Sequence, residues 1–171
     1  DAAGNLETRT DLMGRVTTYD YDQNNRLTSR TYPNAAENVS FTYTITGRRL
    51  TATDARGTTS YGYDIRDRLT TLTQPGFGSG TASLGYTYDG NGNRLTLTAT
   101  VGGQSHTTSY TYDDASRLDV VTDPVDRTYD HGYDANGNRT GLTQPNGSVT
   151  AYTYDNLNRL TKAIDPASEE T

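Results

Sequence analysis

The chain has 171 residues, no cysteine, a net charge of −6 at pH 7 and a pI near 4.8. Without cysteine there is neither a disulfide framework nor a zinc–thiolate site. No run of about 18 apolar residues exists to cross a bilayer, and Lys162 is the single lysine, so the clustered basic face of a nucleic-acid-binding protein is missing. We therefore expect no nucleic-acid partner and no membrane span.

The composition moves apolar surface from aliphatic side chains into tyrosine rings. Leu, Ile, Val and Phe together number 25, whereas the chain holds 14 Tyr and 32 Thr, which favour strands. Few aliphatic residues alone would permit disorder. Each tyrosine ring buries roughly 150–250 Å², so we expect an ordered protein with a thin, tyrosine-based core.

One motif fills the chain: an aromatic residue, any residue, Tyr-Asp, a short Gly- or Asn-rich bend, then Arg-Leu-Thr. Its second tyrosines are 20 to 25 residues apart. In chain order the copies read "YDYDQNNRLT" from Tyr19, "FTYTITGRRLT" from Phe41, "YGYDIRDRLT" from Tyr61, "YTYDGNGNRLT" from Tyr86, "YTYDDASRL" from Tyr110, "HGYDANGNRT" from His131 and "YTYDNLNRLT" from Tyr152.

A second bend lies midway between successive copies. These bends read "YPNAAEN", "TDARGTT", "QPGFGSG", "TVGGQS", "TDPVDR", "QPNGS" and "DPASEE", and all hold turn-forming residues. Two bends per repeat leave two strands of about six or seven residues. The predicted fold class is therefore all-β, with about eight β-hairpins in one curved antiparallel sheet.

The paired aromatic residues of each copy lie two positions apart, so both face the same side of a strand. We expect them to form a structural ladder through the repeats. Its members are Tyr19, Tyr21, Phe41, Tyr43, Tyr61, Tyr63, Tyr86, Tyr88, Tyr110, Tyr112, Tyr133, Tyr152 and Tyr154.

Each bend also carries an aspartate and an arginine. We expect the aspartate to fix the bend and the arginine to bridge to the next repeat or to lie over a tyrosine ring. The predicted pairs are Asp22 with Arg26, Asp64 with Arg68, Asp89 with Arg94, Asp113 with Arg117, Asp134 with Arg139 and Asp155 with Arg159. In the copy at Phe41, Thr44 takes the place of the aspartate.

The arginine alternates between two distances from the second tyrosine. It follows five residues later in four copies and six residues later in three, in strict alternation. We hypothesise that short and long bends alternate and that the structural unit is a pair of hairpins. The partial first copy, "DAAGNLET", is interpreted as another short bend that breaks the alternation. Both ends of the chain fall inside a repeat, so residues 1–171 are expected to be one repeat array truncated mid-repeat at both ends.

The unit "YTYDGNGNRLT", repeated along the whole chain, resembles the YD repeat of the Rhs family. That family includes bacterial Rhs polymorphic toxins, shell components of insecticidal toxin complexes and the animal teneurins. The resemblance implies a long sheet that spirals into a hollow shell around a toxin or other domain, in a secreted or cell-surface protein. The family's Asp-Pro-x-Gly core segment is not found here, and no catalytic residue is carried over.

Candidate sites are each better explained by structure. Asp89 to Asn93 and Asp134 to Asn138 have the oxygen-donor order of a calcium loop, but Arg94 and Arg139 stand where glycine is required, so we interpret both as turns. The repeated aspartates are too alike to be tuned as a catalytic pair. His106 and His131 have no nucleophile pattern beside them. We expect no metal, no cofactor and no enzymatic activity.

The preferred function is a structural wall that encloses or presents a toxin or other domain, with flanking repeats as partners. One alternative is a self-associating extracellular fibre joined by end-to-end strand pairing between copies of the chain. The other is a surface adhesin whose tyrosine faces bind glycans. The motifs "NVS", "NRT" and "NGS" fit the N-glycosylation pattern, which a chain rich in Asn, Ser and Thr produces by chance.

Overall fold

The computed structural model describes residues 1–75 and 80–165. The parts of the predicted second bends that fall on residues 76–79 and 166–171 lie outside the described residues. Within the described ranges, no helix has the length and apolar character that crossing a bilayer requires.

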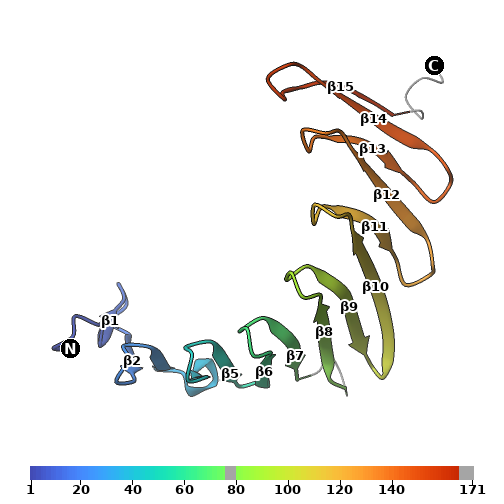
Figure 1. Ribbon diagram of the computed structural model, residues 1–171. Helices are drawn as coiled ribbons and strands as arrows, with labels where there is room; N and C mark the ends of the chain where they lie inside the picture. The colour runs from blue at the N-terminus through green and yellow to red at the C-terminus, as the bar shows by residue number, and fades with distance from the viewer. Residues whose placement is uncertain (76–79, 166–171) are drawn as a thin grey trace. The chain divides into compact units, whose positions relative to one another are not determined.

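Within residues 1–75 and 80–165, fifteen antiparallel strands follow one another in the order of the chain, each hydrogen-bonded to the next in one sheet (Figure 1). The prediction of an all-β array of hairpins is confirmed. The strands are β1 (Thr8–Thr10), β2 (Val16–Tyr21), β3 (Leu27–Thr31), β4 (Val39–Tyr43), β5 (Arg49–Asp54), β6 (Gly57–Tyr63), β7 (Leu69–Gln74), β8 (Ala82–Tyr88), β9 (Arg94–Val101), β10 (Gln104–Tyr112), β11 (Leu118–Thr122), β12 (Thr128–Tyr133), β13 (Arg139–Thr143), β14 (Val149–Tyr154) and β15 (Leu160–Ile164), with a short 3₁₀ helix, η1 (Ala35–Glu37), between β3 and β4.

By its internal contacts the chain divides into two units. The first comprises Asp1–Gly85 with Ala99–Gln104, and the second comprises Tyr86–Thr98 with Ser105–Thr171. Each unit contains the same kind of hairpin, in which a strand ending in aromatic-x-Tyr is followed by a tight bend and a return strand. Because the two units repeat the same contacts, each serves as an independent example of the repeat.

A β-bulge at the second tyrosine recurs in the hairpins. In the hairpin of β6 and β7, Tyr61 faces Leu72 and Gly62 faces Thr71, but Tyr63 faces Leu69. One extra residue on the return strand therefore lies opposite the tyrosine pair. The same shift occurs in the hairpins β2–β3, β4–β5, β10–β11, β12–β13 and β14–β15.

Side chains alternate between the two faces of the sheet, and the bulge keeps both tyrosines of a pair opposite residues of the same face. The tyrosine pair shares its face with the leucine and arginine residues opposite, such as Leu69 and Leu72. The other face carries mainly Thr, Ser and Gly. On it, threonine hydroxyls bond across neighbouring strands in the pairs Thr42–Thr51 (2.6 Å), Thr53–Thr58 (2.8 Å), Thr87–Thr96 (2.6 Å), Thr98–Thr107 (2.9 Å) and Thr153–Thr161 (2.9 Å).

The expected tyrosine core is wrong in one respect. None of the described residues, hydrophobic or polar, is fully buried, and every tyrosine is half-buried. A single-layer sheet has no second layer to cover either face, so the rings gain only lateral packing within the sheet. Stability must then come from contacts repeated between neighbouring strands and bends.

Candidate functional site

The bend after each second tyrosine, here called the YD bend, is held by its first residue. In the YD bend Asp22–Arg26, the N–H of Asp22 donates to the carbonyl of Arg26 (2.9 Å), and the N–H of Asn25 donates to the carbonyl of Asp22 (3.0 Å). Asn25 has φ = 58°, a left-handed conformation that Asn and Gly adopt most readily. The sequence thus forms a turn closed by one left-handed residue, a common hairpin connection.

The aspartate carboxylate accepts hydrogen bonds from its own bend. Oδ1 of Asp22 accepts from the N–H groups of Asn24 (2.9 Å) and Arg26 (3.0 Å), and Oδ2 accepts from Nε of Arg26 (2.7 Å). The backbone hydrogen bond from Arg26 is the largest cause that lowers the pKa of Asp22, with partial burial opposing it. Asp64, Asp113 and Asp155 have lowered pKa values for the same leading reason.

Two of the predicted Asp–Arg pairs are corrected. Asp89 and Asp134 accept instead from the side-chain amides of Asn93 (2.9 Å) and Asn138 (2.8 Å) in their own bends. The pairs with Arg26, Arg68, Arg117 and Arg159 each have a 2.7 Å contact between Nε and Oδ2. The arginine that follows each asparagine, Arg94 or Arg139, is the first residue of the return strand.

The hypothesis of alternating short and long bends is wrong. Every YD bend closes with the same two backbone hydrogen bonds, from the first residue to the fifth and from the fourth to the first. What alternates is the residue type at the fourth and fifth positions of the bend. We call the bends Asp22–Arg26, Asp64–Arg68, Asp113–Arg117 and Asp155–Arg159 Arg-type, because arginine is fifth and the fourth residue is not glycine. We call Thr44–Arg48, Asp89–Asn93 and Asp134–Asn138 Gly-type, because glycine is fourth.

The partial first copy also fits this alternation. Asp1 makes the same bonds as Asp89: Oδ1 accepts from Ala3 (2.9 Å) and Asn5 (2.8 Å), and Oδ2 accepts from the Asn5 amide (2.9 Å). Gly4 is fourth, with φ = 86°. Asp1–Asn5 is therefore a Gly-type bend that precedes an Arg-type bend, and the interpretation of it as a break in the pattern is wrong.

In two Arg-type bends the arginine reaches the Gly-type bend of the next copy. Nη1 of Arg26 donates to the carbonyl of Thr44 (3.1 Å), and its guanidinium lies 4.8 Å from the ring centre of Tyr43. In the second unit, Arg117 donates to the carbonyl of Asp134 (3.1 Å) and lies 4.6 Å from the ring of Tyr133. A Cβ at Gly47 or at Gly137 would lie 3.9 Å from the arginine Nη1, an ordinary contact distance, and both glycines have positive φ, 91° and 88°.

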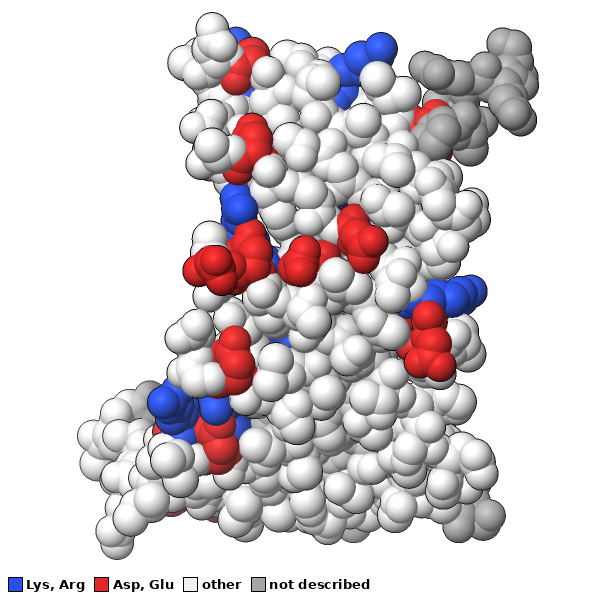
Figure 2. Space-filling view, turned by 45° about the vertical axis from the view of Figure 1, so that its right-hand side comes forward, with Lys and Arg blue, Asp and Glu red and all other residues white. Residues whose placement is uncertain are grey.

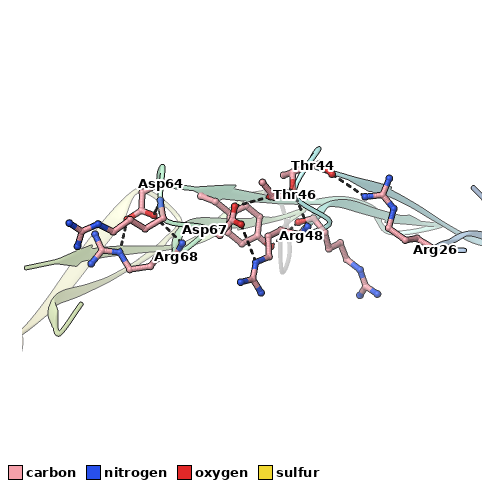
Figure 3. A network of polar contacts seen from close by, with 10 residues as sticks. Arg26, Thr44, Thr46, Arg48, Asp64, Asp67 and Arg68 are labelled. Atoms are coloured by element: carbon pink, nitrogen blue, oxygen red, sulfur yellow. Dashed lines mark hydrogen bonds and ion pairs between the residues drawn. The ribbon is translucent and has the colours of Figure 1, made fainter. Parts of the chain in front are cut away.

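Gly-type bends contact the next copy differently. The Asn5 amide donates to Asn25 Oδ1 and the Asn138 amide to Asn158 Oδ1, both at 2.9 Å. Between the bends at Thr44 and Asp64, Thr46 donates to Asp67 (2.8 Å) and Arg48 lies 3.9 Å from the same carboxylate. Figure 3 shows the polar contacts across three successive bends: Arg26 with the Thr44 carbonyl, and Thr46 and Arg48 with Asp67. In each case the fourth residue of the Arg-type bend points toward the preceding copy.

The second tyrosine of a copy forms a hydrogen bond to the return strand of the preceding copy. The ladder between β5 and β6 stops at Thr51 and Ser60, so the first residues of the return strand have no strand partner on that side. The tyrosine hydroxyl donates to the carbonyl there. These bonds are Tyr21 to Leu6 (3.1 Å), Tyr43 to Leu27 (2.7 Å), Tyr63 to Arg49 (2.8 Å), Tyr112 to Arg94 (2.9 Å), Tyr133 to Leu118 (2.9 Å) and Tyr154 to Arg139 (3.0 Å).

The first aromatic position meets arginine from the return strands. Arg94 lies 4.4 Å from the ring centre of Tyr110, and Arg139 lies 4.6 Å from that of Tyr152, each in the next copy. Arg49 instead lies 4.5 Å from Phe41 of its own copy. Cations over aromatic faces are attracted by the ring quadrupole. Arginines at the fifth and sixth positions therefore contact different rings of the repeat.

Two further Asp–Arg bends were missed by the sequence reasoning. Asp11–Arg15 and Asp123–Arg127 form the same closed bend at the opposite ends of the hairpins, each with a 2.7 Å contact between arginine Nε and the carboxylate. The motif search began at the tyrosine, which these bends lack. The spacing Asp-x-x-Gly-Arg or Asp-x-x-Asp-Arg would have found them.

The charged groups of the bends are already occupied by structural contacts. Figure 2 shows charged side chains in small groups, some with both signs together, separated by broad uncharged areas. Within residues 1–75 and 80–165 no three His, Asp or Glu side chains gather as a metal ion would require. Burial, followed by the nearby Arg139, lowers the pKa of His131, which stands at a first aromatic position.

A sequence model of the RHS repeat matches residues 1–37 and 133–170. These two stretches of the chain carry RHS repeats. The resemblance to the YD-repeat family, drawn from the motif, is thereby confirmed. No curated protein matches the chain significantly in sequence.

Solved structures share the fold of these RHS repeats. A Photorhabdus luminescens Tc holotoxin pore with a mutation in TccC3 superposes with a TM-score of 0.74 at 24% identity over 94% of this chain. A crystal structure named TcdB2-TccC3-TEV gives 0.74 at 23% over 100%, and TcdB2-TccC3 without its hypervariable C-terminal region gives 0.72 at 23% over 94%. The chain spans about 10% of the length of each of these proteins.

Proposed function

We propose that this RHS-repeat segment is part of the wall of a secreted or cell-surface shell that encloses or presents a toxin or another domain. The observation that carries the proposal is the one-layer sheet with two unlike faces and no buried interior among the described residues. A sheet of this kind cannot form a compact domain by itself, but it can divide one space from another. The shared fold with part of the Tc toxin proteins supports the same role.

The tyrosine face and the bends give such a wall its rigidity. Hydroxyl-to-carbonyl bonds at 2.7–3.1 Å connect each copy to the one before it, and arginine bridges connect successive bends at 3.1 Å. A side-chain hydrogen bond contributes about 0.5–1.5 kcal/mol to folding stability. Since the hydroxyl bond is found in six of the seven copies and the arginine bridge in two, the sum of these contacts grows with the number of repeats in the wall.

The threonine face suits contact with an enclosed chain. Its hydroxyls pair with each other across strands, as Thr42 does with Thr51 at 2.6 Å, so few donors are left free to bind a partner tightly. In the described strands this face carries mainly Thr, Ser and Gly, and a contiguous large apolar patch is what would hold an unfolded polypeptide. We therefore assign this face to the enclosed side of the wall.

A second candidate is a fibre built from copies of the chain. It would form by strand pairing between copies, because the unpaired edge strand of a sheet can pair with another chain. Glycan binding on the tyrosine face is less favoured. Six of the second tyrosines already donate their hydroxyls to the backbone, and arginines lie over several rings.

Intact mass and N-terminal sequencing of the protein from its native source distinguish the two candidates. The wall predicts a polypeptide far heavier than 18.7 kDa, in which these residues are one segment. A mass near 18.7 kDa would contradict the wall and favour the fibre. A control antibody against the recombinant chain identifies the correct species in the native extract.

A further inference from the structure

Three asparagines of the chain are followed directly by glycine: Asn91, Asn136 and Asn146. All three are exposed and stand third in a closed five-residue bend, with the glycine fourth. The glycines have positive φ values of 99°, 88° and 82°. Because glycine has no side chain beside its own nitrogen, this nitrogen can approach the preceding asparagine side chain closely. The Asn-Gly dipeptide is therefore the place where such a bend can react with itself.

The reaction is the closure of a succinimide ring. The glycine nitrogen attacks Cγ of the asparagine, and a C–N bond forms while the bond from Cγ to the side-chain nitrogen breaks. The glycine proton passes through the solvent to the leaving nitrogen, which departs as ammonia. Water then opens the ring at one of its two carbonyls and leaves an aspartate or an isoaspartate. Water is the one co-reactant that this sequence of steps consumes.

The three glycine nitrogens are held to different degrees. Each donates to the carbonyl of the first residue of its bend: Gly92 to Asp89 at 3.3 Å, Gly137 to Asp134 at 3.1 Å and Gly147 to Gln144 at 2.8 Å. The longest of these distances falls outside the usual range of an N–H···O hydrogen bond, and the shortest falls well inside it. The nitrogen of Gly92 is therefore the one most easily released for the attack.

The asparagine side chains differ in the same order. Oδ1 of Asn146 accepts from the N–H (3.0 Å) and from the hydroxyl (2.7 Å) of Ser148. Among the described residues, the side-chain amides of Asn91 and Asn136 form no hydrogen bond. Cγ of Asn91 can therefore turn toward the glycine nitrogen without breaking a side-chain bond, whereas Cγ of Asn146 must first leave two donors.

We propose that Asn91 is a site of spontaneous deamidation, and that hydrogen bonding within the bends sets the order of reaction as Asn91, then Asn136, then Asn146. This modification is independent of the role of the chain as a wall. It concerns the stability of single bends over time.

The product changes the bend in which it forms. An isoaspartate at position 91 adds one methylene carbon to the backbone inside the ring that the N–H of Asp89 and the carbonyl of Asn93 close at 2.9 Å. The Asp89 carboxylate also accepts from the N–H of Asn91 and from both the N–H and the amide of Asn93. All these bonds depend on a bend of five ordinary residues, so deamidation loosens this bend first.

Mass spectrometry of tryptic peptides follows the three sites separately within one chain. Cleavage at the arginines places each Asn-Gly in a peptide of its own, covering residues 69–94, 128–139 and 140–159. The full chain is incubated in mildly alkaline buffer, and the fraction of each peptide in which oxygen has replaced the amide nitrogen is measured over time. A parallel incubation in urea gives the rates of the same three dipeptides without the fold.

A hydrogen bond that must break before the attack slows the reaction by about two- to tenfold. We therefore expect Asn91 to react about tenfold faster than Asn146 in the folded chain, with Asn136 between them. In urea the three sites should react at similar rates, because all three are Asn-Gly. Any other order of the three rates in the folded chain would overturn the proposal.

Ser148→Ala is the matched variant. It removes the hydroxyl that donates to Oδ1 of Asn146, so Asn146 should react faster than in the parent chain. Asn91 is the internal control, because its bend is unchanged and its rate should stay the same. An unchanged or slower rate of Asn146 in the folded variant would also overturn the proposal, since a slower rate would make the hydroxyl an activator of ring closure.

Discussion

The second tyrosine of each repeat acts through its hydroxyl as well as through its ring. Tyr112 donates to the carbonyl of Arg94 at 2.9 Å, and the equivalent Tyr63 donates to the carbonyl of Arg49, beyond the last paired residues of the β5–β6 ladder. Removal of a donor to a backbone carbonyl costs about 0.5–1.5 kcal/mol. The tyrosine thus replaces the ladder hydrogen bond that the splayed strands lack, which explains why this position requires tyrosine.

We predict that Tyr112→Phe lowers the free energy of unfolding by about 1 kcal/mol because one carbonyl loses its donor. Tyr110→Phe is the matched control, since Tyr110 lies two residues away on the same face and no hydrogen bond from its hydroxyl is found in the described part of the chain. Urea denaturation followed by circular dichroism measures both. Equal losses in the two variants would show that the hydroxyl contact carries no stability.

The bend aspartates make the fold sensitive to acid. The backbone N–H of Arg117, the leading cause, lowers the pKa of Asp113 in the folded chain below its ordinary value of 3.8. A lowered carboxyl pKa contributes stability that is present above about pH 4 and is lost as the pH falls through the folded value. We predict that Asp113→Asn reduces stability at pH 7 and weakens the decline below pH 4.

Asp114→Asn is the matched control for this prediction. Asp114 is the second residue of the same bend and is exposed. Its replacement removes the same charge without removing an acceptor of the bend N–H groups. Urea midpoints between pH 2 and pH 7 for both variants give the comparison, and identical pH profiles would refute the role of the Asp113 bonds.

His131 adds a second pH dependence in a different range. Burial and then Arg139 lower its pKa below 6.5, while Asp130 and Asp119 act in the opposite direction. The folded chain thus favours neutral His131, so stability should fall as the pH drops below about 6.5. We predict that His131→Tyr removes this fall, because tyrosine occupies the same position in other copies. A fall between pH 7 and pH 5 that persists in this variant would assign it to another group.

At the scale of the hairpin, the two bend types form a pattern that the backbone alone does not show. All the bends close in the same way, but they differ in what they contact in the neighbouring copy. Arg26 and Arg117 donate to a bend carbonyl of the next copy, whereas Asn5 and Asn138 donate to the fourth side chain of the next bend.

We predict that Gly137→Asn disturbs Arg117, because the new Cβ already lies at contact distance, 3.9 Å, from its Nη1 and the amide group beyond the Cβ extends toward the guanidinium. Gly147→Asn is the control. Gly147 has a similar φ, 82° compared with 88°, but nothing lies within 4 Å of its Cβ direction. Phenylglyoxal should modify Arg117 faster in the first variant only. The same rate in both would show that the space at Gly137 does not matter.

The array of hairpins could be predicted from sequence because its signals are local. Strand alternation and the Gly, Asn and Asp residues of the bends depend on a few neighbouring residues only. The two aromatic residues of the pair lie on one face because they are two positions apart in a strand. The bend chemistry was harder to predict. An arginine at the sixth position, such as Arg94, was interpreted as a longer bend because sequence does not show where the bend ends and the return strand begins.

The contacts between copies also could not be predicted from the sequence. The donation from Arg26 to the Thr44 carbonyl joins residues 18 apart and depends on how two hairpins lie together. The lack of a buried core could not be predicted either, because composition indicates how much apolar surface the chain has but not whether a second layer covers it. The Asp11–Arg15 bend is not predicted by the aromatic-x-Tyr motif because no tyrosine precedes it.

At the scale of the whole molecule, a one-layer RHS-repeat sheet is suited to be a wall. Among the described residues it has no fully buried side chain, and its two faces differ in chemistry. Its stability is distributed over repeated contacts, so extension of the array adds strength without a new core.

The most direct test of this account is electron microscopy of the native protein, purified with an antibody against the recombinant chain. The account predicts a closed, hollow particle with density inside it, and protease treatment should spare that enclosed part until the wall is opened by denaturant. Open filaments or small solid particles, with every segment cut at the same rate, would contradict the account.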